Sequence, residues 1–513
     1  MEKEKSKLGL GALVLFVSGV ICKFLGAFFR MPLTNLLGLE GIGVFQLIMT
    51  IYSFALVLVS GGTTLALTKL ISTARAKGEE WKISVYVKRA LLVGVGTGIL
   101  LGSAFALVWK SLSIFQGIEP NRSYWLFLLL LPLGSVIASL RGYFQGNENM
   151  LPTAISQIVE QAVKFVFGLL FAYLLVRSGV QYGVLGAFVG VTLGELIAFV
   201  VILIWFLAKR GKSVAEKDIK DVQKEFDKTN IMLLLSSAIL PLVNAFDGVM
   251  IVPRLVKAGF LAGDATQLFG LQSGVVGTVL NFPLIISLAV TTAMLPNFSY
   301  LVSKGKLKKH IIEKGLKILL LCVLPTTFGL VAISKQLLPI FYVALTEEVL
   351  DTMFNLMLFG AFAIVFAAIM QYFSTLLLAC GEFKFNLFIT LGGGVLKGGV
   401  SFILAGVPSV NIYALIFGNI AIGAFVSLLA IIKLKKIVSI NLAFGEVFDV
   451  LFSTATMFAV VYSFLQGNPF GRILNLAIAV LLGILTYVVF AIPLILKILP
   501  KKRSKGLKPA PDG

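Results

Sequence analysis

The stretch VLGAFVGVTLGELIAFVVILIWFL, residues 184–207, decides the fold class, because Glu195 is its one charged side chain. About 20 apolar residues in a helix cross the hydrocarbon core of a bilayer. The 513-residue chain as a whole is 58% hydrophobic and 13% charged, with a mean hydropathy of +0.99. A soluble domain carries about 25% charged residues. These values exclude a soluble enzyme, a nucleic-acid-binding protein and a disordered scaffold.

Thirteen further stretches resemble the first in length and composition. Backbone polar groups in lipid must form their hydrogen bonds within each segment, so we predict an all-α polytopic membrane protein with fourteen transmembrane helices. The predicted spans are residues 8–29, 42–65, 84–108, 124–140, 153–176, 184–207, 231–252, 268–294, 311–333, 353–378, 385–404, 412–432, 448–465 and 473–496.

Lysine and arginine residues lie mostly on one side of these spans. The side that holds both termini has 33 of the 44 basic residues, the opposite side has eight, and three lie within spans. Short loops rich in Lys and Arg stay in the cytoplasm, so both termini are predicted to be cytoplasmic. The formal net charge of +20 is then explained by loops beside anionic lipid, without nucleic acid as a partner.

The longest predicted loop is KRGKSVAEKDIKDVQKEFDKTN, residues 209–230, which carries charges of both signs. We predict a cytoplasmic linker with some surface helix. It divides the chain into residues 1–208 with six spans, residues 231–433 with six spans, and residues 434–513 with two spans and a basic cytoplasmic tail. No loop is large enough for a catalytic domain, so an enzyme is not expected.

Matched residues in the two six-span halves indicate an internal repeat. The halves are separated by an even number of spans and therefore share one topology. This predicts two pseudo-symmetric six-helix lobes with a cleft between them. The alternative is that apolar sequences match by chance. The matched pairs are Arg30 and Arg254, Phe45 and Phe269, Thr63 and Thr291, Lys77 and Lys304, Gly146 and Gly381, and Lys164 and Lys397.

Metal and cofactor chemistry is not indicated. The three cysteines, Cys22, Cys322 and Cys380, are far apart in apolar sequence, and the single histidine, His310, lies in a basic loop. These positions predict neither a disulfide framework nor a metal site. No cofactor is expected.

Charged residues within the predicted spans need a partner or a wet cavity, because an isolated charge at mid-bilayer costs about 2.5–3.5 kcal/mol. Glu160 and Lys164 are four residues apart, a spacing that suits an ion pair on one helix face. That pair is either structural or functional. Glu195 is predicted to be a structural hydrogen-bonding group. The six residues of this kind are Lys23, Glu160, Lys164, Glu195, Asp247 and Lys397.

Asp247 is the candidate for coupling transport to an ion. It shares a helix face with Arg254, seven residues later, and follows Pro241, which should kink the helix. An acid in a kinked transmembrane helix suits a cation or proton site. The alternative is a buried Asp247–Arg254 pair.

Five basic residues are candidates for a substrate site in the cleft. The repeat relates Arg30 to Arg254 and Lys164 to Lys397, so both lobes would contribute cations. Such a cavity would attract a phosphate or pyrophosphate group. The alternative is that Arg30 and Arg254 only reach toward the membrane interface. The five candidates are Lys23, Arg30, Lys164, Arg254 and Lys397.

The stretch LRGYFQGNENMLPTAISQIVEQAVK, residues 140–164, strongly resembles a signature of the stage V sporulation protein B family. These are polysaccharide-transporter-like proteins of the MOP exporter superfamily, which also contains the MATE transporters. KFLGAFFRMPLTNLLGLEGIGVFQ, residues 23–46, and VPRLVKAGFLAGDATQLFGLQSG, residues 252–274, are similar to two further stretches of that family. The resemblance covers essentially the whole chain and implies a location in the plasma membrane of a bacterium.

This resemblance implies a flippase for lipid-linked saccharides. The family is similar to the MurJ lipid II flippases, whose two lobes rock around a cationic central cavity. Functional arginines of that relative lie on its first, second and eighth helices. Lys23 and Arg30 match the first-helix pair, with a spacing that differs by one residue and with Lys in place of one Arg. Span 42–65 has no charge that could match.

We therefore expect alternating access that moves a lipid-linked saccharide with a pyrophosphate head group, either a lipid II-like cell-wall precursor or a polysaccharide unit. A coupling cation, H⁺ or Na⁺, and membrane lipids are the other expected partners, and a monomer is expected. One alternative is an ion-coupled multidrug or cation antiporter of the same superfamily, which would need a more acidic cavity. Another is a non-transporting scaffold for envelope or spore-cortex assembly, which would need larger loops.

Overall fold

The computed structural model describes residues 2–209, 219–343, 346–437, 444–467 and 470–498. Helices make up nearly all of these residues, and they contain no strand. The helices are α1 (Glu2–Ser60), α2 (Thr63–Ala76), α3 (Trp81–Phe115), η1 (Arg122–Leu126), α4 (Phe127–Gly146), α5 (Leu151–Val176), α6 (Val180–Lys209), α7 (Ile219–Lys257), α8 (Ala262–Phe269), η2 (Gly270–Val276), α9 (Gly277–Ser303), α10 (Lys309–Phe341), α11 (Glu347–Ala379), α12 (Phe383–Leu404), α13 (Tyr413–Lys435), α14 (Phe444–Gly467) and α15 (Arg472–Ile498).

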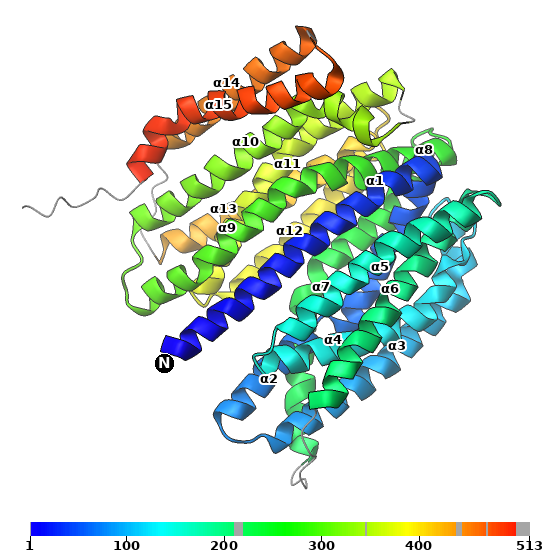
Figure 1. Cartoon of the computed structure of the whole chain (residues 1–513), viewed down its shortest axis with the longest axis vertical. Helices are drawn as coiled ribbons and strands as arrows, with labels where there is room; N and C mark the ends of the chain where they lie inside the picture. The colour runs from blue at the N-terminus through cyan, green and yellow to red at the C-terminus, as the bar shows by residue number, and fades with distance from the viewer. Residues whose placement is uncertain (1, 210–218, 344–345, 438–443, 468–469, 499–513) are drawn as a thin grey trace, which may run out of the picture.

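The first two predicted spans lie within α1. A straight helix of its 59 residues would extend about 90 Å, roughly three times the thickness of a hydrocarbon core. The chain instead turns back at Gly38, whose φ of 71° and ψ of 179° are readily adopted only by glycine. Figure 1 shows the chain running from the N-terminus to α8 and returning to α2. Thirteen helices of the described residues are long and apolar enough to cross a membrane, and the first, Leu13–Ala76, contains two spans. The total therefore agrees with the fourteen predicted.

The helices form two lobes, with α14 and α15 packed on the outside of the second (Figure 1). The first lobe contains α1 to α6, and the second contains α7 to α13. On α14 and α15, Met457 and Ala479 share an apolar cluster with Ala332 of α10. The Tyr487 hydroxyl of α15 donates a hydrogen bond to the carbonyl oxygen of Leu321 at 3.0 Å. This arrangement is the predicted plan of six, six and two spans.

We call the end of the bundle where α6 stops and α7 begins the linker end, and the end where α1 turns at Gly38 the far end. At the linker end, α7 starts at Ile219, so the described part of the predicted linker is helical. Val222 and Phe226 are buried with side chains of α2 and α3, and Arg89 pairs with Asp227 at 2.7 Å. The first turns of α7 are therefore anchored to the first lobe.

At the far end, glycines allow the two lobes to touch backbone to backbone. A Cβ atom on Gly43 would lie 2.2 Å from the carbonyl oxygen of Thr266, and one on Gly270 would lie 2.3 Å from that of Leu39. Small residues permit such close approach between helices in lipid. The far end is closed here, and any larger side chain would force the lobes apart.

Asn35 ties α1 to the end of α10 beside these glycines. Its Nδ2 donates a hydrogen bond to the carbonyl oxygen of Phe341 at 2.7 Å, and its Oδ1 accepts one from the backbone N–H of Val343 at 3.3 Å. Two bonds from one side chain orient α1 against the second lobe. These contacts complete the closure of the far end.

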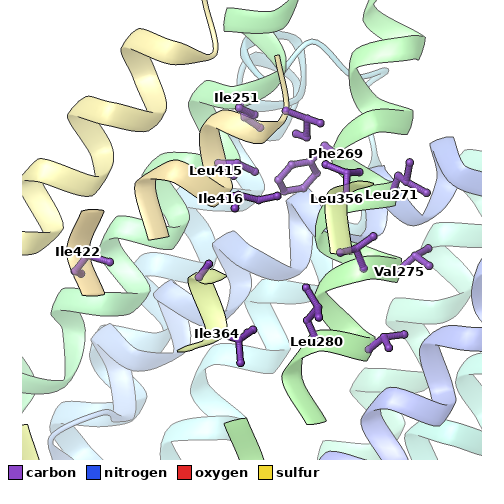
Figure 2. Packing of buried hydrophobic residues seen from close by; sticks show 14 of the residues in the cluster. Ile251, Phe269, Leu271, Val275, Leu280, Leu356, Ile364, Leu415, Ile416 and Ile422 are labelled. Atoms are coloured by element: carbon purple, nitrogen blue, oxygen red, sulfur yellow. The ribbon is translucent and has the colours of Figure 1, made fainter. Parts of the chain in front are cut away.

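The buried core of the second lobe surrounds the space described below as the central cavity. Figure 2 shows buried hydrophobic side chains that α7, α8, η2, α9, α11 and α13 contribute to this core. Phe269, Leu280, Ile364 and Leu415 belong to this core and also line the cavity. Close packing of these side chains fixes the cavity wall, because packed interiors have few voids.

We predict that Gly43→Val prevents the far end from closing. Overpacking of this kind costs about 1–3 kcal/mol, so the population of the open state relative to the closed state should rise about fivefold or more. In a background with the three native cysteines replaced, a cysteine at Gln272 should react faster with a membrane-impermeant maleimide in vesicles of known orientation. Gly263→Val is the control, since a Cβ there meets nothing within 4 Å. Equal labelling rates in the two variants would contradict the closure described here.

Candidate functional site

Two adjoining cavities lie between α1 and the second lobe. The linker-side cavity, of about 720 Å³, is lined by α1, α7, α9, α11 and α12. The central cavity, of about 400 Å³, lies toward the far end and is lined by the same helices together with α8, η2 and α13. Leu284 and Ala367 line both. Each of the two volumes is in the range of sites for small molecules.

Carboxamide side chains dominate the polar surface of the central cavity. Each amide offers two donors and one acceptor oxygen, a combination that suits sugar hydroxyls. The Oε1 atoms of Gln46 and Gln272 are buried and have no hydrogen-bond partner among the described residues, so both are available to a ligand. The amides of the lining are Gln46, Asn244, Gln272, Asn281 and Asn419, with Thr50 and Ser273 beside them.

Lys397 and Asp247 form an ion pair in the wall of the central cavity. Lys397 Nζ lies 3.1 Å from Asp247 Oδ2 and donates a hydrogen bond to Asn244 Oδ1 at 2.7 Å. Lys397 is 6% exposed and Asp247 is 8% exposed. The predicted coupling residue is thus paired with a predicted substrate ligand, and the alternative Asp247–Arg254 pair is not formed.

Lys23 lines the linker-side cavity from α1. Its side chain is exposed, and no ion-pair partner lies within reach among the residues that the structure describes. Phe24, the next residue, contacts Phe282 of α9 with ring centroids 5.2 Å apart. Lys23 is therefore a cation without an ion-pair partner in the described part of the chain, and it lies beside the seam between α1 and α9.

Arg30 lies between the two lobes near the far end. Its Nη1 donates a hydrogen bond to Thr278 Oγ1 at 3.2 Å, and Thr278 follows Gly277, which lines the central cavity. The buried Tyr342 phenol is close to the Arg30 guanidinium. Burial raises the pKa of Tyr342, and the positive charge of Arg30 opposes that rise. Arg30 thus contributes positive charge beside the cavity.

Glu160 and Lys164 do not form the expected pair. Arg141 of α4 reaches Glu160 instead, with Nη2 2.9 Å from Oε2, and its Nε donates to Ser156 Oγ at 3.0 Å. Lys164 Nζ lies 5.4 Å from the ring centroid of Phe29. A guanidinium from a neighbouring helix can bond both acceptors at once, which an ammonium on the same helix face cannot match. Both residues lie within the first lobe and line neither cavity.

Glu195 accepts a hydrogen bond from the Tyr52 hydroxyl, also inside the first lobe. This is the structural hydrogen-bonding role that the sequence predicts. Its other carboxylate oxygen, Oε2, is buried and has no hydrogen-bond partner among the described residues.

Arg254 packs against the end of α12. Its Nε donates a hydrogen bond to the carbonyl oxygen of Phe402 at 3.0 Å, and its guanidinium carbon lies 4.3 Å from the centroid of the Phe402 ring. It lines neither of the two cavities. This position is the one expected for a residue that anchors a helix end.

The structure does not gather the five candidate cations in one cavity. Of the described residues that line the two cavities, Lys23, Asp247 and Lys397 are the titratable ones, so the lining carries one net positive charge. Lys23 and Lys397 line the cavities, Arg30 lies beside the lining, and Lys164 and Arg254 contact Phe29 and Phe402 instead. The amide set was missed, although uncharged amides within spans are the signal that could have revealed it.

Comparison with known proteins places the chain in a family. A family model described as polysaccharide biosynthesis protein matches residues 8–302. Stage V sporulation protein B of Bacillus subtilis (strain 168) is 24% identical over 458 residues, which cover 85% of each chain. The lipid II flippase MurJ of the same organism is 24% identical over 367 residues, which cover 66% of each chain.

Solved structures share the fold. A lipid II flippase MurJ in an inward closed conformation matches with a TM-score of 0.67 and 16% identity, over 96% of this chain and 100% of that chain. An inward-facing MATE multidrug resistance transporter of the MOP superfamily matches with a TM-score of 0.61 and 14% identity, over 81% of this chain and 95% of that chain. By name, both solved structures are of transport proteins. Because the family model matches more than half of the sequence, this multi-pass membrane protein belongs to the polysaccharide biosynthesis protein family.

Proposed function

We propose that this protein moves a lipid-linked saccharide with a phosphate-containing head group across the membrane by alternating access. The observation that carries the proposal is the amide-lined central cavity, which adjoins the linker-side cavity and is closed at the far end. The family match and the lipid II flippase among the relatives support this substrate class.

The saccharide would occupy the central cavity. Its hydroxyl groups would exchange hydrogen bonds with the amides there, including Gln46 and Gln272, whose free acceptor oxygens need donors. A buried acceptor without a donor is unfavourable by about 1–3 kcal/mol. A ligand rich in hydroxyls therefore suits this lining better than an apolar drug.

The phosphate would meet basic residues on its route. Lys23 lies at the linker-side cavity, Arg30 lies near the far end and Lys397 lines the central cavity. These three residues are the substrate ligands that we continue to propose. The contacts of Lys164 and Arg254 within their own lobes support structural roles for both.

The lipid tail would lie in a groove on the outside of the second lobe. This groove, of about 500 Å³, lies between α9, α10, α14 and α15 and is almost entirely apolar, with Phe282, Leu330 and Ile484 in its lining. Phe282 also contacts Phe24, which follows Lys23. A substrate that crosses the α1–α9 seam there would keep its tail in the groove and its head in the cavities.

We further propose that both termini are cytoplasmic, that the protein lies in the plasma membrane, and that transfer runs from the linker end outward. The excess of basic residues on the side of the termini supports this orientation. An inside-negative potential favours outward movement of an anion by about 2.3 kcal/mol per charge per 100 mV. An antiporter of organic cations would require a more acidic lining than one carboxylate and two lysines.

A substitution in the cavity tests saccharide recognition. Asn281→Leu removes an amide of the central cavity and should lower the rate of flipping about five- to tenfold, since a lost hydrogen bond is worth about 1–1.5 kcal/mol. The measurement uses proteoliposomes that contain a polyprenyl-pyrophosphate disaccharide with a fluorescent sugar label and an impermeant quencher. Asn297→Leu, an exposed amide on the same helix, should flip at the wild-type rate. Flipping by Asn281→Leu at the wild-type rate would overturn this use of the cavity.

A second substitution tests the groove. Ile484→Trp should fill the space between α10 and α15, so that flipping of a long-chain polyprenyl substrate falls toward the rate of a short-chain analogue. Leu485→Trp adds the same side chain one residue further along α15, outside the groove lining, and should leave the preference for long chains intact. If Ile484→Trp keeps that preference, the tail travels elsewhere.

A further inference from the structure

The ion pair between Lys397 and Asp247 has unused bonding capacity on both sides. An ammonium has three donors, and Lys397 uses two of them, on Asp247 Oδ2 and Asn244 Oδ1. On the other side, Asp247 Oδ1 and the neighbouring Ser401 Oγ of α12 are both buried, and neither forms a regular hydrogen bond with the described residues. One free donor and one free acceptor therefore remain at the wall of a polar cavity.

No other described residue that lines the central cavity is charged. The remaining lining of the central cavity comes from α1, α8, η2, α9, α11 and α13, and none of those lining residues titrates. Among the charged residues of the packed helices, Arg254 on α7 lines a small adjoining pocket with Asp247 and is held by Phe402, and Lys23 and Arg30 lie on α1. An anion that enters the cavity would therefore act mainly on Asp247 and Lys397.

We propose that Asp247 is a replaceable counter-ion, which neutralises Lys397 while the cavity is empty and takes up one proton when an anionic head group binds Lys397 in its place. This inference rests on the proposed function and specifies how the same site couples substrate binding to protons.

Asp247 should take up a proton when an anion binds Lys397 because the dielectric constant of the site is low. An ammonium that is 6% exposed is stabilised by an anion beside it. When a phosphate provides that anion, a second negative charge on Asp247 is repelled, and repulsion between like charges favours the protonated carboxyl. The proton comes from water and is added to the carboxylate, so that loading adds the anion and one proton together. Release of the anion reverses both steps.

The consequence is a linkage between pH and affinity. Where Asp247 is ionised in the empty protein and protonated in the loaded protein, affinity should rise by up to about tenfold for each unit by which the pH is lowered. Without the carboxylate, this contribution vanishes and Lys397 is free at every pH.

The test measures binding of geranylgeranyl pyrophosphate to the full-length protein in nanodiscs between pH 5.5 and 8. The phosphates of the probe titrate alike in every variant, so the readout is the ratio of the dissociation constants of wild type and variant at each pH. For Asp247→Asn, we expect binding about tenfold tighter than wild type at pH 8, with the ratio falling as the pH is lowered. Lys397→Gln should bind weakly throughout.

Glu382→Gln is the matched control. Glu382 pairs with Lys433 at 3.0 Å outside both cavities, so this change removes a carboxylate from a lysine without touching the site. It should follow wild type at every pH. If Asp247→Asn does not fold, Asp247→Glu keeps a carboxylate and should keep the wild-type dependence on pH, whereas Asp247→Ser should lose it.

The outcomes separate the two proposals. If wild type binds the probe but Asp247→Asn binds no tighter at pH 8, or shows a constant ratio, the counter-ion exchange is wrong and the transport proposal stands. If wild type does not bind the probe at any pH, the proposed function is wrong and the exchange fails with it.

Discussion

A charge inside a membrane protein is unfavourable without a partner, and this cost decides where the ionisable side chains of this chain lie. Asp247 with Lys397, and Glu160 with Arg141, form ion pairs between neighbouring helices. Glu195 accepts a hydrogen bond from Tyr52. Each partner comes from a different helix, so these contacts hold the helices of a lobe together. Because most charges are used in this way, the cavities are lined mainly by neutral amides.

The same constraint links structure to transport. A cavity with little net charge can admit a neutral saccharide and a charged phosphate. When the substrate leaves, few buried charges in the lining lose a partner. The close glycine contacts at the far end let the backbones of the two lobes meet directly. The first turns of α7 connect the lobes at the linker end, where Arg89 pairs with Asp227. Rocking of the lobes would therefore have to bend α7 or release that pair.

The fold could be predicted from the sequence because the apolar pattern of a transmembrane span is long and is repeated along the chain. Each span is an apolar run of about the length required to cross a bilayer, and the charged segment 209–230 separates the halves. The sequence predicted a connection between spans 8–29 and 42–65, but not that helix continues on both sides up to a single turn at Gly38. The ion-pair partners of the charged residues were harder to predict from the sequence. Spacing along one helix favoured Glu160 with Lys164, but Arg141 lies closer in space, and sequence spacing carries no information about neighbouring helices.

Only part of the candidate site could be predicted, because sequence spacing does not show which helices are neighbours. Lys23 and Lys397 line the two cavities, as a basic cleft requires, whereas Arg254 packs on Phe402. The amides were overlooked because Gln and Asn within spans carry no charge to attract notice.

The most direct measurement is native mass spectrometry of the protein purified gently from its own membrane. Our account predicts one copy of a polyprenyl-phosphate-linked saccharide bound per chain. Detection of ordinary phospholipids alone, with no saccharide-bearing lipid, would contradict it.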